Sequence, residues 1–355
     1  MSANNCGESK LKRHKLFSAV TVFVLVIVLA TSGCTAKSNN AVPGFELEKE
    51  ITNYSEVSSK FADEMLKSLP KTSEVRRYSL FIQDSADVGY LKSDAVDNVN
   101  LFYDSFAEQL KDFDTQIIIF SDPDWAKKKI EKLYAGQDDL NLITNDFGNG
   151  NFFDKKTCKD SNSLYGYAMK LSKPLIVIST QCTSLKILED KEKAPIQLSI
   201  ISHELAHVAQ SKISENDHNC YLPNWFIEGQ AQAISSIVTT YKGKNYQSQI
   251  RSDWFNYNPS GRLDDNENYV SPGSDKGDGG VYSDGSLAIE YLVARSGWEK
   301  MKKMMTLASG ISGGKCGTLG KMSYFKESFR VVYNQEFQDF QNEVNKYLRW
   351  AIDNS

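Results

Sequence analysis

Residues 202–210 read Ser-His-Glu-Leu-Ala-His-Val-Ala-Gln. On a helix of 3.6 residues per turn, His203 and His207 lie on one face, where two imidazoles can bind the same metal ion. Glu204 lies beside them, where a carboxylate can take a proton from water at that ion. The chain has four histidines in 355 residues, so chance would give this pattern in roughly a few of every thousand such chains. The stretch therefore predicts a metal site, and the alternative is an ordinary helix with two hydrogen-bonded histidines.

The residues around this motif favour a helix independently of any metal. Pro195 suits the first turn of a helix. Apolar residues recur at spacings of three and four, as on a buried helix face: Leu198, Ile201, Leu205 and Val208. Ile196 and Ile200 extend the metal-binding face toward the amino end. The histidines are thus predicted to project from a packed helix, which fixes them better than a loop would.

The first residues of the chain have the pattern of an export signal. Four basic residues between positions 10 and 15 precede an apolar run over residues 16–30, and small residues then lead to Cys34. The end of this run resembles the lipobox of bacterial lipoproteins, although Thr31 stands where leucine is usual. The resemblance implies a membrane-anchored lipoprotein of the bacterial cell envelope, lipidated at Cys34. The alternatives are an uncleaved single-span anchor and ordinary secretion.

These features divide the chain into four parts. Residues 1–33 are predicted to be a signal peptide of lipoprotein type, 34–45 a tether, 46–75 an N-terminal helical segment and 76–355 the main domain. Removing the signal takes away four basic residues and one acidic residue, so the net charge falls from −4 to −7. A chain with that balance is not expected to bind nucleic acid.

Beyond the signal and Cys34, four cysteines form an even set: Cys158, Cys182, Cys220 and Cys316. An exported chain meets an oxidising environment, so two disulfides are predicted. Three pairings are possible, and Cys158 with Cys182 is preferred, because this pair encloses a short loop, leaving Cys220 with Cys316. No Cys-x-x-Cys occurs, which disfavours a cysteine zinc site.

A strand–helix–strand order is predicted at the start of the main domain. Residues 77–83 alternate like a strand, residues 96–110 carry a helical apolar stripe, and residues 115–120 form a short apolar run of strand type. A helix start follows at residues 121–124.

The composition of residues 135–163 is typical of a loop. Two more strands are predicted at residues 165–167 and 174–179. The second of them comes shortly before the metal helix, so it is a candidate sheet edge with which an extended peptide can pair.

Two histidines leave a zinc ion short of protein ligands, so a further ligand is expected beyond His207. Residues 224–231 read Asn-Trp-Phe-Ile-Glu-Gly-Gln-Ala and place Glu228 on a second predicted helix. The apolar aromatic run before Glu228 disfavours the alternative of a surface carboxylate. His218 competes with it, but the polar neighbours of His218 predict an exposed turn.

Three motifs together resemble the gluzincin metallopeptidases. His-Glu-x-x-His is followed about twenty residues later by Trp-x-x-Glu-Gly, and residues 282–285, Tyr-Ser-Asp-Gly, open an apolar helix. The nearest likeness is the peptidase-MA-like group, which is related to the zinc aminopeptidases, and it covers about residues 76–350. The resemblance implies an α+β zincin-type domain, with a small mixed β-sheet subdomain followed by a mainly helical part. It also implies a zinc peptidase of the cell envelope that acts on a peptide or protein substrate.

The matching positions imply a role for each site residue. His203, His207 and Glu228 would bind zinc, and Glu204 would be the general base when water attacks an amide carbonyl. Glu204 would then pass the proton to the leaving amine. The alternative is a noncatalytic envelope lipoprotein that uses the zincin frame as a binding module. The intact Glu204 argues against it, because a structural metal site needs no base.

The resemblance also implies a tyrosine hydroxyl near the carbonyl oxygen of the substrate. Tyr282 fits because it precedes the apolar helix, and Tyr269 and Tyr291 are alternatives. The Gly-Ala-Met-Glu-Asn type of motif that grips a free amino terminus is absent, so exopeptidase activity is not supported. Gln232 stands where thermolysin-like relatives place an aspartate that holds a histidine, and its amide oxygen could accept the ring N–H.

Overall fold

The computed structural model describes residues 51–68, 76–84, 86, 91–149, 164–182, 199–214, 221–240, 259–263, 279–312 and 320–354. The chain falls into two units, Met1–Phe45 and Glu46–Ser355, and all of these residues belong to the second unit. Several features singled out in the sequence lie outside the described residues: the signal peptide, the tether, Cys34, Cys158, Pro195, His218, Cys220, Tyr269 and Cys316.

The described residues form an α+β structure, which confirms the predicted fold class at this level. The strands are β1 (Tyr78–Ile82), β2 (Thr115–Phe120), β3 (Tyr165–Met169) and β4 (Leu175–Ser179). The helices before the metal motif are η1 (Tyr54–Glu56), α1 (Val57–Ser68), α2 (Leu91–Ser105), α3 (Ala107–Leu110), α4 (Pro123–Leu133) and α5 (Asp139–Asn149). The later helices are α8 (Ser199–Ile213), α9 (Asn224–Thr240), α11 (Gly279–Ser296), α12 (Trp298–Ser312), α13 (Lys321–Tyr333) and α14 (Phe337–Asp353).

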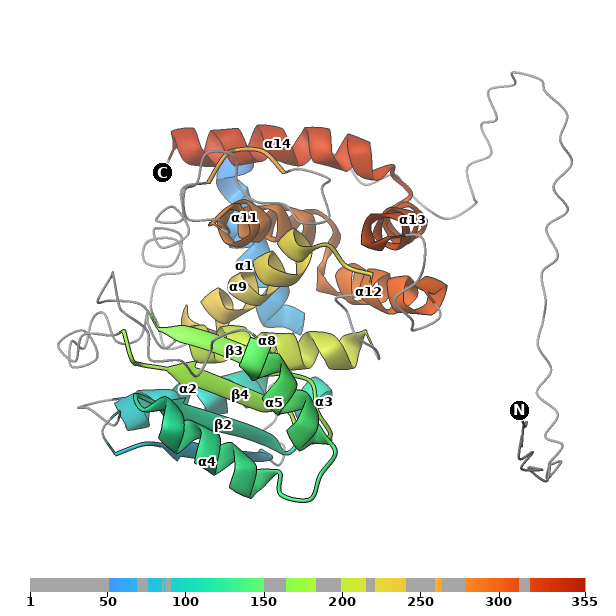
Figure 1. The fold of residues 1–355 in the computed structure, drawn as a ribbon. Helices are drawn as coiled ribbons and strands as arrows, with labels where there is room; N and C mark the ends of the chain where they lie inside the picture. The colour runs from blue at the N-terminus through green and yellow to red at the C-terminus, as the bar shows by residue number, and fades with distance from the viewer. Residues whose placement is uncertain are drawn as a thin grey trace, which may run out of the picture. The chain divides into compact units, whose positions relative to one another are not determined.

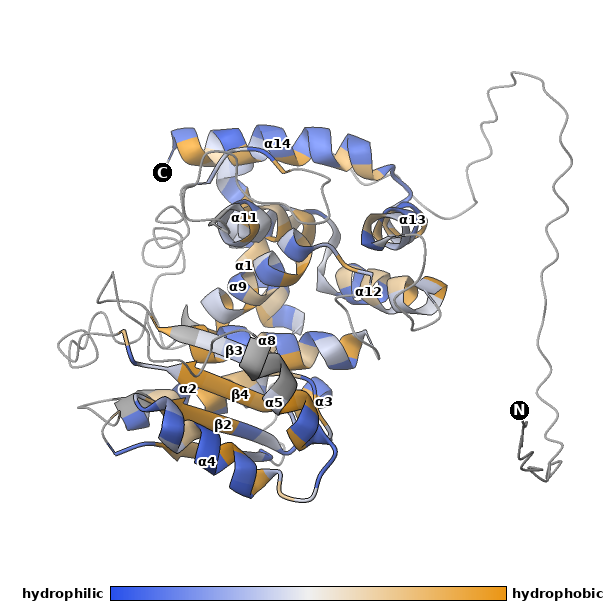
Figure 2. Cartoon of the chain, viewed as in Figure 1, coloured by the Kyte–Doolittle hydropathy of each residue, from blue (hydrophilic) through white to orange (hydrophobic). Residues whose placement is uncertain are grey.

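The four strands form one mixed sheet in the order β1-β2-β4-β3. β1 with β2 and β2 with β4 are parallel pairs, and β3 pairs with β4 in the antiparallel sense. Side chains of the two central strands alternate between two apolar clusters. Ile117, Ile119, Ile176 and Ile178 join the larger cluster, and Ile118, Phe120, Leu175 and Val177 join the smaller one. Both strands are therefore buried on both faces, and Figure 2 shows them as hydrophobic.

The predicted edge position of residues 174–179 is wrong, because β4 lies inside the sheet and, among the described strands, β3 is at the edge. The reason lies in the residues of the two strands. β4 is a continuous run of buried residues, which is typical of a strand with neighbours on both sides. β3 contains Gly166 and the exposed Tyr167. β4, the last described strand before α8 in the sequence, therefore has a neighbouring strand on each side.

Residues 139–149 form helix α5, so the prediction of a loop there is wrong. Ile143 is buried in the smaller cluster, and Leu140 packs against that cluster. The Asp139 carboxylate accepts a hydrogen bond from the Ser172 backbone N–H at 3.0 Å, which fixes the start of the helix. These tertiary contacts outweigh the low helix propensity of the asparagine and glycine residues in the segment.

Helix α8 lies between the sheet and the later helices (Figure 1). It contacts β3 and β4 on one side and α9 on another, while α4 packs on β2. Apolar and polar residues of α8 are both buried, on most sides of the helix, which is typical of a helix in a protein interior. The helix with the metal motif is thus held by both parts of the fold.

No described helix combines the length and the apolar character needed to cross a membrane.

Cys182, just after β4, is disulfide-bonded. Its partner lies outside the described residues, so the predicted pairing stays a prediction.

Helices α9 and α11 meet at two glycines. A Cβ atom on Gly229 would lie 2.6 Å from the Gly285 carbonyl oxygen, and a Cβ on Gly285 would lie 3.1 Å from the Gly229 Cα atom. The Cβ on Gly285 would also collide with the carbonyl oxygen of Trp225. The two backbones therefore touch directly, which is possible because glycine has no side chain. The glycines of the Trp-x-x-Glu-Gly and Tyr-Ser-Asp-Gly motifs thus set the distance between the two helices.

Gly285→Ala is expected to lower the free energy of unfolding by about 1–3 kcal/mol, because the added methyl group meets backbone atoms that cannot rotate away. The gain in helix propensity, about 1 kcal/mol, offsets only part of this loss. Gly310→Ala in α12 is the matched control, since no atom lies within 4 Å of its added Cβ. It is expected to keep or raise stability. Urea unfolding measures both, and equal midpoints would contradict the close helix contact.

Candidate functional site

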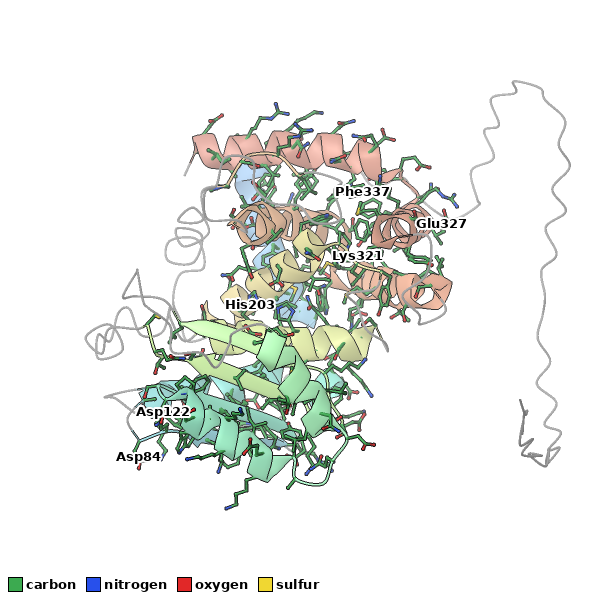
Figure 3. All side chains as sticks on the ribbon, in the orientation of Figure 1. Asp84, Asp122, His203, Lys321, Glu327 and Phe337 are labelled. Carbon is green, nitrogen blue, oxygen red and sulfur yellow. The ribbon has the colours of Figure 1, made fainter. Side chains whose placement is uncertain are left out.

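His203, His207 and Glu228 bring three donor atoms together between the sheet and the later helices, where Figure 3 labels His203. His203 Nε2 lies 3.2 Å from His207 Nε2 and 3.2 Å from Glu228 Oε2. His207 Nε2 lies 3.4 Å from the same carboxylate oxygen. α8 supplies the two histidines one turn apart, and α9 supplies the glutamate. The residues that the sequence singled out as ligands therefore share one site.

The triangle of donors has the size that a tetrahedral zinc ion requires. Zinc bonds to nitrogen and oxygen are about 2.0–2.1 Å long, so two ligands of a tetrahedron are about 3.3 Å apart. The three separations in the structure, from 3.2 to 3.4 Å, match that edge. Two imidazoles and a carboxylate are also a donor set that suits zinc. Three protein ligands would leave the fourth corner for water or a substrate atom.

The ligand side chains carry a proton when no metal is bound. Burial lowers the pKa of His207, but the charge and hydrogen bond of Glu228, the charge of Glu204 and the hydrogen bond of Gln210 together outweigh burial and raise that pKa to about 9. Burial raises the pKa of Glu228, but the charge of His207 and hydrogen bonds from both histidines hold it well below its usual range. The metal-free site therefore holds a proton at neutral pH, and metal binding must release it.

A buried pair of amides fixes the orientation of the His207 ring. Gln210 Nε2 donates to the Ile227 carbonyl oxygen and to Gln230 Oε1, each at 2.8 Å. The other end of that amide, Oε1, lies 2.8 Å from His207 Nδ1 and must be an acceptor there. His207 therefore carries its proton on Nδ1 when neutral, and Nε2 is left as a ligand atom that faces the site.

Gln232 is the residue predicted to accept a histidine ring N–H. In the structure it is Gln210 that accepts this N–H, from His207. Gln210 follows His207 by three residues on the same helix, so helical spacing was a signal in the sequence that could have identified it. His203 Nδ1 is buried and has no hydrogen-bond partner in the described part of the chain. The His203 ring instead contacts the rings of His207 and Tyr282, with centroids 4.9 and 5.8 Å away.

Glu204 is buried beside the ligands, against strand β3. A Cβ atom on Gly166 would lie 2.5 Å from Glu204 Oε1 and 2.9 Å from Ile200 Cγ1, so the carboxylate occupies the space that a side chain would need. Burial raises the pKa of Glu204, although the nearby histidines act in the opposite sense. Gly166 is a site residue that sequence reasoning missed, because its contact with α8 depends on the sheet order.

A cleft of about 410 Å³ gives access to these residues. It is lined by the three ligands, Glu204, Tyr282, residues 166–170, Val208, Ser211 and Ile227. Of the alternatives to Tyr282, Tyr291 is fully buried, and its ring stacks on that of Tyr347 with centroids 5.4 Å apart. Tyr269 lies outside the described residues. Tyr282 is therefore the candidate tyrosine that the structure brings to the site.

The fold and the site together define an α+β protein with a candidate three-ligand metal centre in a cleft. Comparisons with protein-family models, curated proteins and solved structures found no match to this chain.

Gln210→Met is expected to weaken zinc affinity by roughly ten- to a hundredfold, because it removes the acceptor that orients the His207 ring. Gln232→Met is the matched control on α9, and it should change zinc affinity little. Competition with a chromophoric chelator measures both. Equal losses in the two variants would contradict the assignment of Gln210.

Proposed function

We propose that this protein is a zinc-dependent peptidase with a zincin-type domain. The observation that carries the proposal is the donor triangle of His203, His207 and Glu228, with Glu204 beside it in an open cleft. A bound zinc ion would supply Lewis-acid activation of water at about neutral pH and polarise a substrate carbonyl. The order of the elements along the chain also supports the proposal, because a small mixed sheet precedes α8 and a mainly helical part follows it.

Glu204 is the proposed general base. It would accept a proton from the attacking water and later donate it to the leaving amine. Its burial supports this role, because a carboxyl whose pKa is raised toward the working pH both takes up and releases protons readily. Contact with the Gly166 backbone holds the carboxylate next to the ligands.

Strand β3 is the proposed binding surface for the substrate backbone. An extended peptide can add to an open sheet edge through main-chain hydrogen bonds, and residues 166–170 of this edge line the cleft. Ala168 is small and lies on the same side of the strand as Gly166, where the Glu204 carboxylate occupies the space beside the glycine. This arrangement favours an extended peptide or protein segment over a compact small molecule.

The proposed location is the bacterial cell envelope, with a lipid on Cys34 as the membrane anchor. The export-type pattern before Cys34 supports it. The disulfide at Cys182 adds support, because disulfides persist in oxidising compartments.

Cys34→Ala is expected to release the protein from membranes in cell fractionation. Continued membrane association of an unprocessed variant would indicate an uncleaved anchor instead.

Glu204→Gln is expected to keep one zinc per chain while peptide cleavage falls on the order of a thousandfold, because the amide keeps the shape but cannot act as a base. Metal analysis and a broad peptide library measure the two properties. Glu131→Gln on α4, which is exposed and does not line the cleft, is the matched control. A zinc-loaded wild-type protein that cleaves no library peptide would favour a noncatalytic binding module.

Tyr282→Phe tests the proposed hydroxyl donor. The carbonyl oxygen gains negative charge as water attacks, so a donor there stabilises the transition state more than the bound substrate. Loss of the hydroxyl is expected to lower kcat on the order of a hundredfold, with KM and zinc content little changed. Steady-state kinetics and metal analysis measure this, and an unaltered kcat would remove Tyr282 from the mechanism.

A further inference from the structure

The cleft wall carries a positive charge that the proposed chemistry does not use. Lys170 follows the last residue of β3 and lines the cleft with Val208, Ser211 and Ile227. Its Nζ atom lies 3.4 Å from the carbonyl oxygen of Ser211. Among the described residues that line this cleft, Lys170 is the one lysine or arginine.

The position of Lys170 relative to the ligands follows from the two elements that frame the cleft. Ser211 comes four residues after His207 on α8, which is about 6 Å further along the helix axis. On the other wall, β3 runs from Gly166, against Glu204, to Lys170, against Ser211. An extended peptide advances about 3.3 Å per residue, so a group two or three residues from the cleaved bond reaches the ammonium.

Apolar side chains form part of the cleft walls near the candidate ligands. Val208 follows His207 on α8, Ile227 precedes Glu228 on α9, and both are buried. Such walls suit the aliphatic stem of a side chain, and the charged end would then meet Lys170. An ammonium group has three N–H donors, so it can bind a ligand carboxylate while it keeps a contact within the protein.

We infer that Lys170 selects substrates that carry a carboxylate two or three residues from the cleaved bond. The inference rests on the proposed peptidase function and names a substrate class for it. The carboxylate has two possible sources, an Asp or Glu side chain or the free carboxyl terminus of the peptide. Both present the same group to the ammonium, and peptides with blocked or free ends separate them.

The test uses the zinc-loaded full chain and neutral peptides with both ends blocked. A single Glu is moved through each position within three residues of the cleaved bond, and every peptide is paired with its Gln counterpart. At one position the Glu peptide is expected to have a kcat/KM about three- to fivefold higher, as for an exposed ion pair. A second pair compares a free carboxyl terminus with a terminal amide.

Four variants assign the preference to Lys170. Lys170→Gln should abolish it, Lys170→Arg should keep it, and Lys170→Glu should replace it with a preference for a Lys peptide over the Gln peptide. Lys173→Gln, an exposed lysine in the same turn that does not line the cleft, should leave the preference unchanged. No preference for a carboxylate in any peptide, or one that persists in Lys170→Gln, would overturn the inference.

Binding separates this inference from the peptidase proposal. The affinities of the Glu and Gln peptides are measured with the zinc-loaded Glu204→Gln protein, in which no cleavage is needed, and with the Glu204→Gln/Lys170→Gln double variant. If the wild-type protein cleaves no peptide, the peptidase proposal fails, yet tighter binding of the Glu peptide that depends on Lys170 still supports the carboxylate site. Equal affinities for the two peptides overturn it whether or not cleavage occurs.

Discussion

The direct contact between the Gly229 and Gly285 backbones is the constraint on which the site depends. Glu228 immediately precedes one glycine, and Tyr282 stands three residues, almost one helical turn, before the other. A change in the distance between α9 and α11 would therefore move the candidate metal ligand Glu228 relative to the candidate hydroxyl donor Tyr282. Since α9 also packs on α8, the same contact relates both groups to His203 and His207. The glycines of the two motifs are thus part of the geometry of the site although they carry no reactive group.

The polar network behind His207 adds a second constraint. Gln210 and Gln230 are fully buried, and the Gln230 amide nitrogen lies 3.3 Å from the sulfur of Met305 on α12. Burial of amides is unfavourable unless their donors and acceptors are satisfied, and here the amides bond to each other and to the Ile227 carbonyl. The network therefore favours one arrangement of α8, α9 and α12, and the orientation of the His207 ring is a consequence of that arrangement.

The sequence predicted what depends on local spacing and missed what depends on the order of the strands. The apolar run Thr115–Phe120 is β2, and helix α4 begins where Asp122 and Pro123 predicted, with the Asp122 carboxylate accepting the Asp124 N–H. Helical spacing also placed the two histidines on one face. The edge position of β3 and the contact of Gly166 with Glu204 depend on the order of the strands in the sheet. That order differs from the order in the sequence, and the spacing of apolar residues does not reveal it.

The position of β3 at the edge of the sheet has a consequence for the solubility of the protein. Within the part of the chain that the structure describes, β3 has a strand partner on one side alone. Unpaired edge backbone groups accept any extended chain, including an unfolded copy of the same protein, so such edges promote aggregation. Short edge strands and lysines limit this tendency, and β3 has five residues and is followed by Lys170. The short length of β3 and the lysine that follows it therefore oppose lasting edge-to-edge association between molecules.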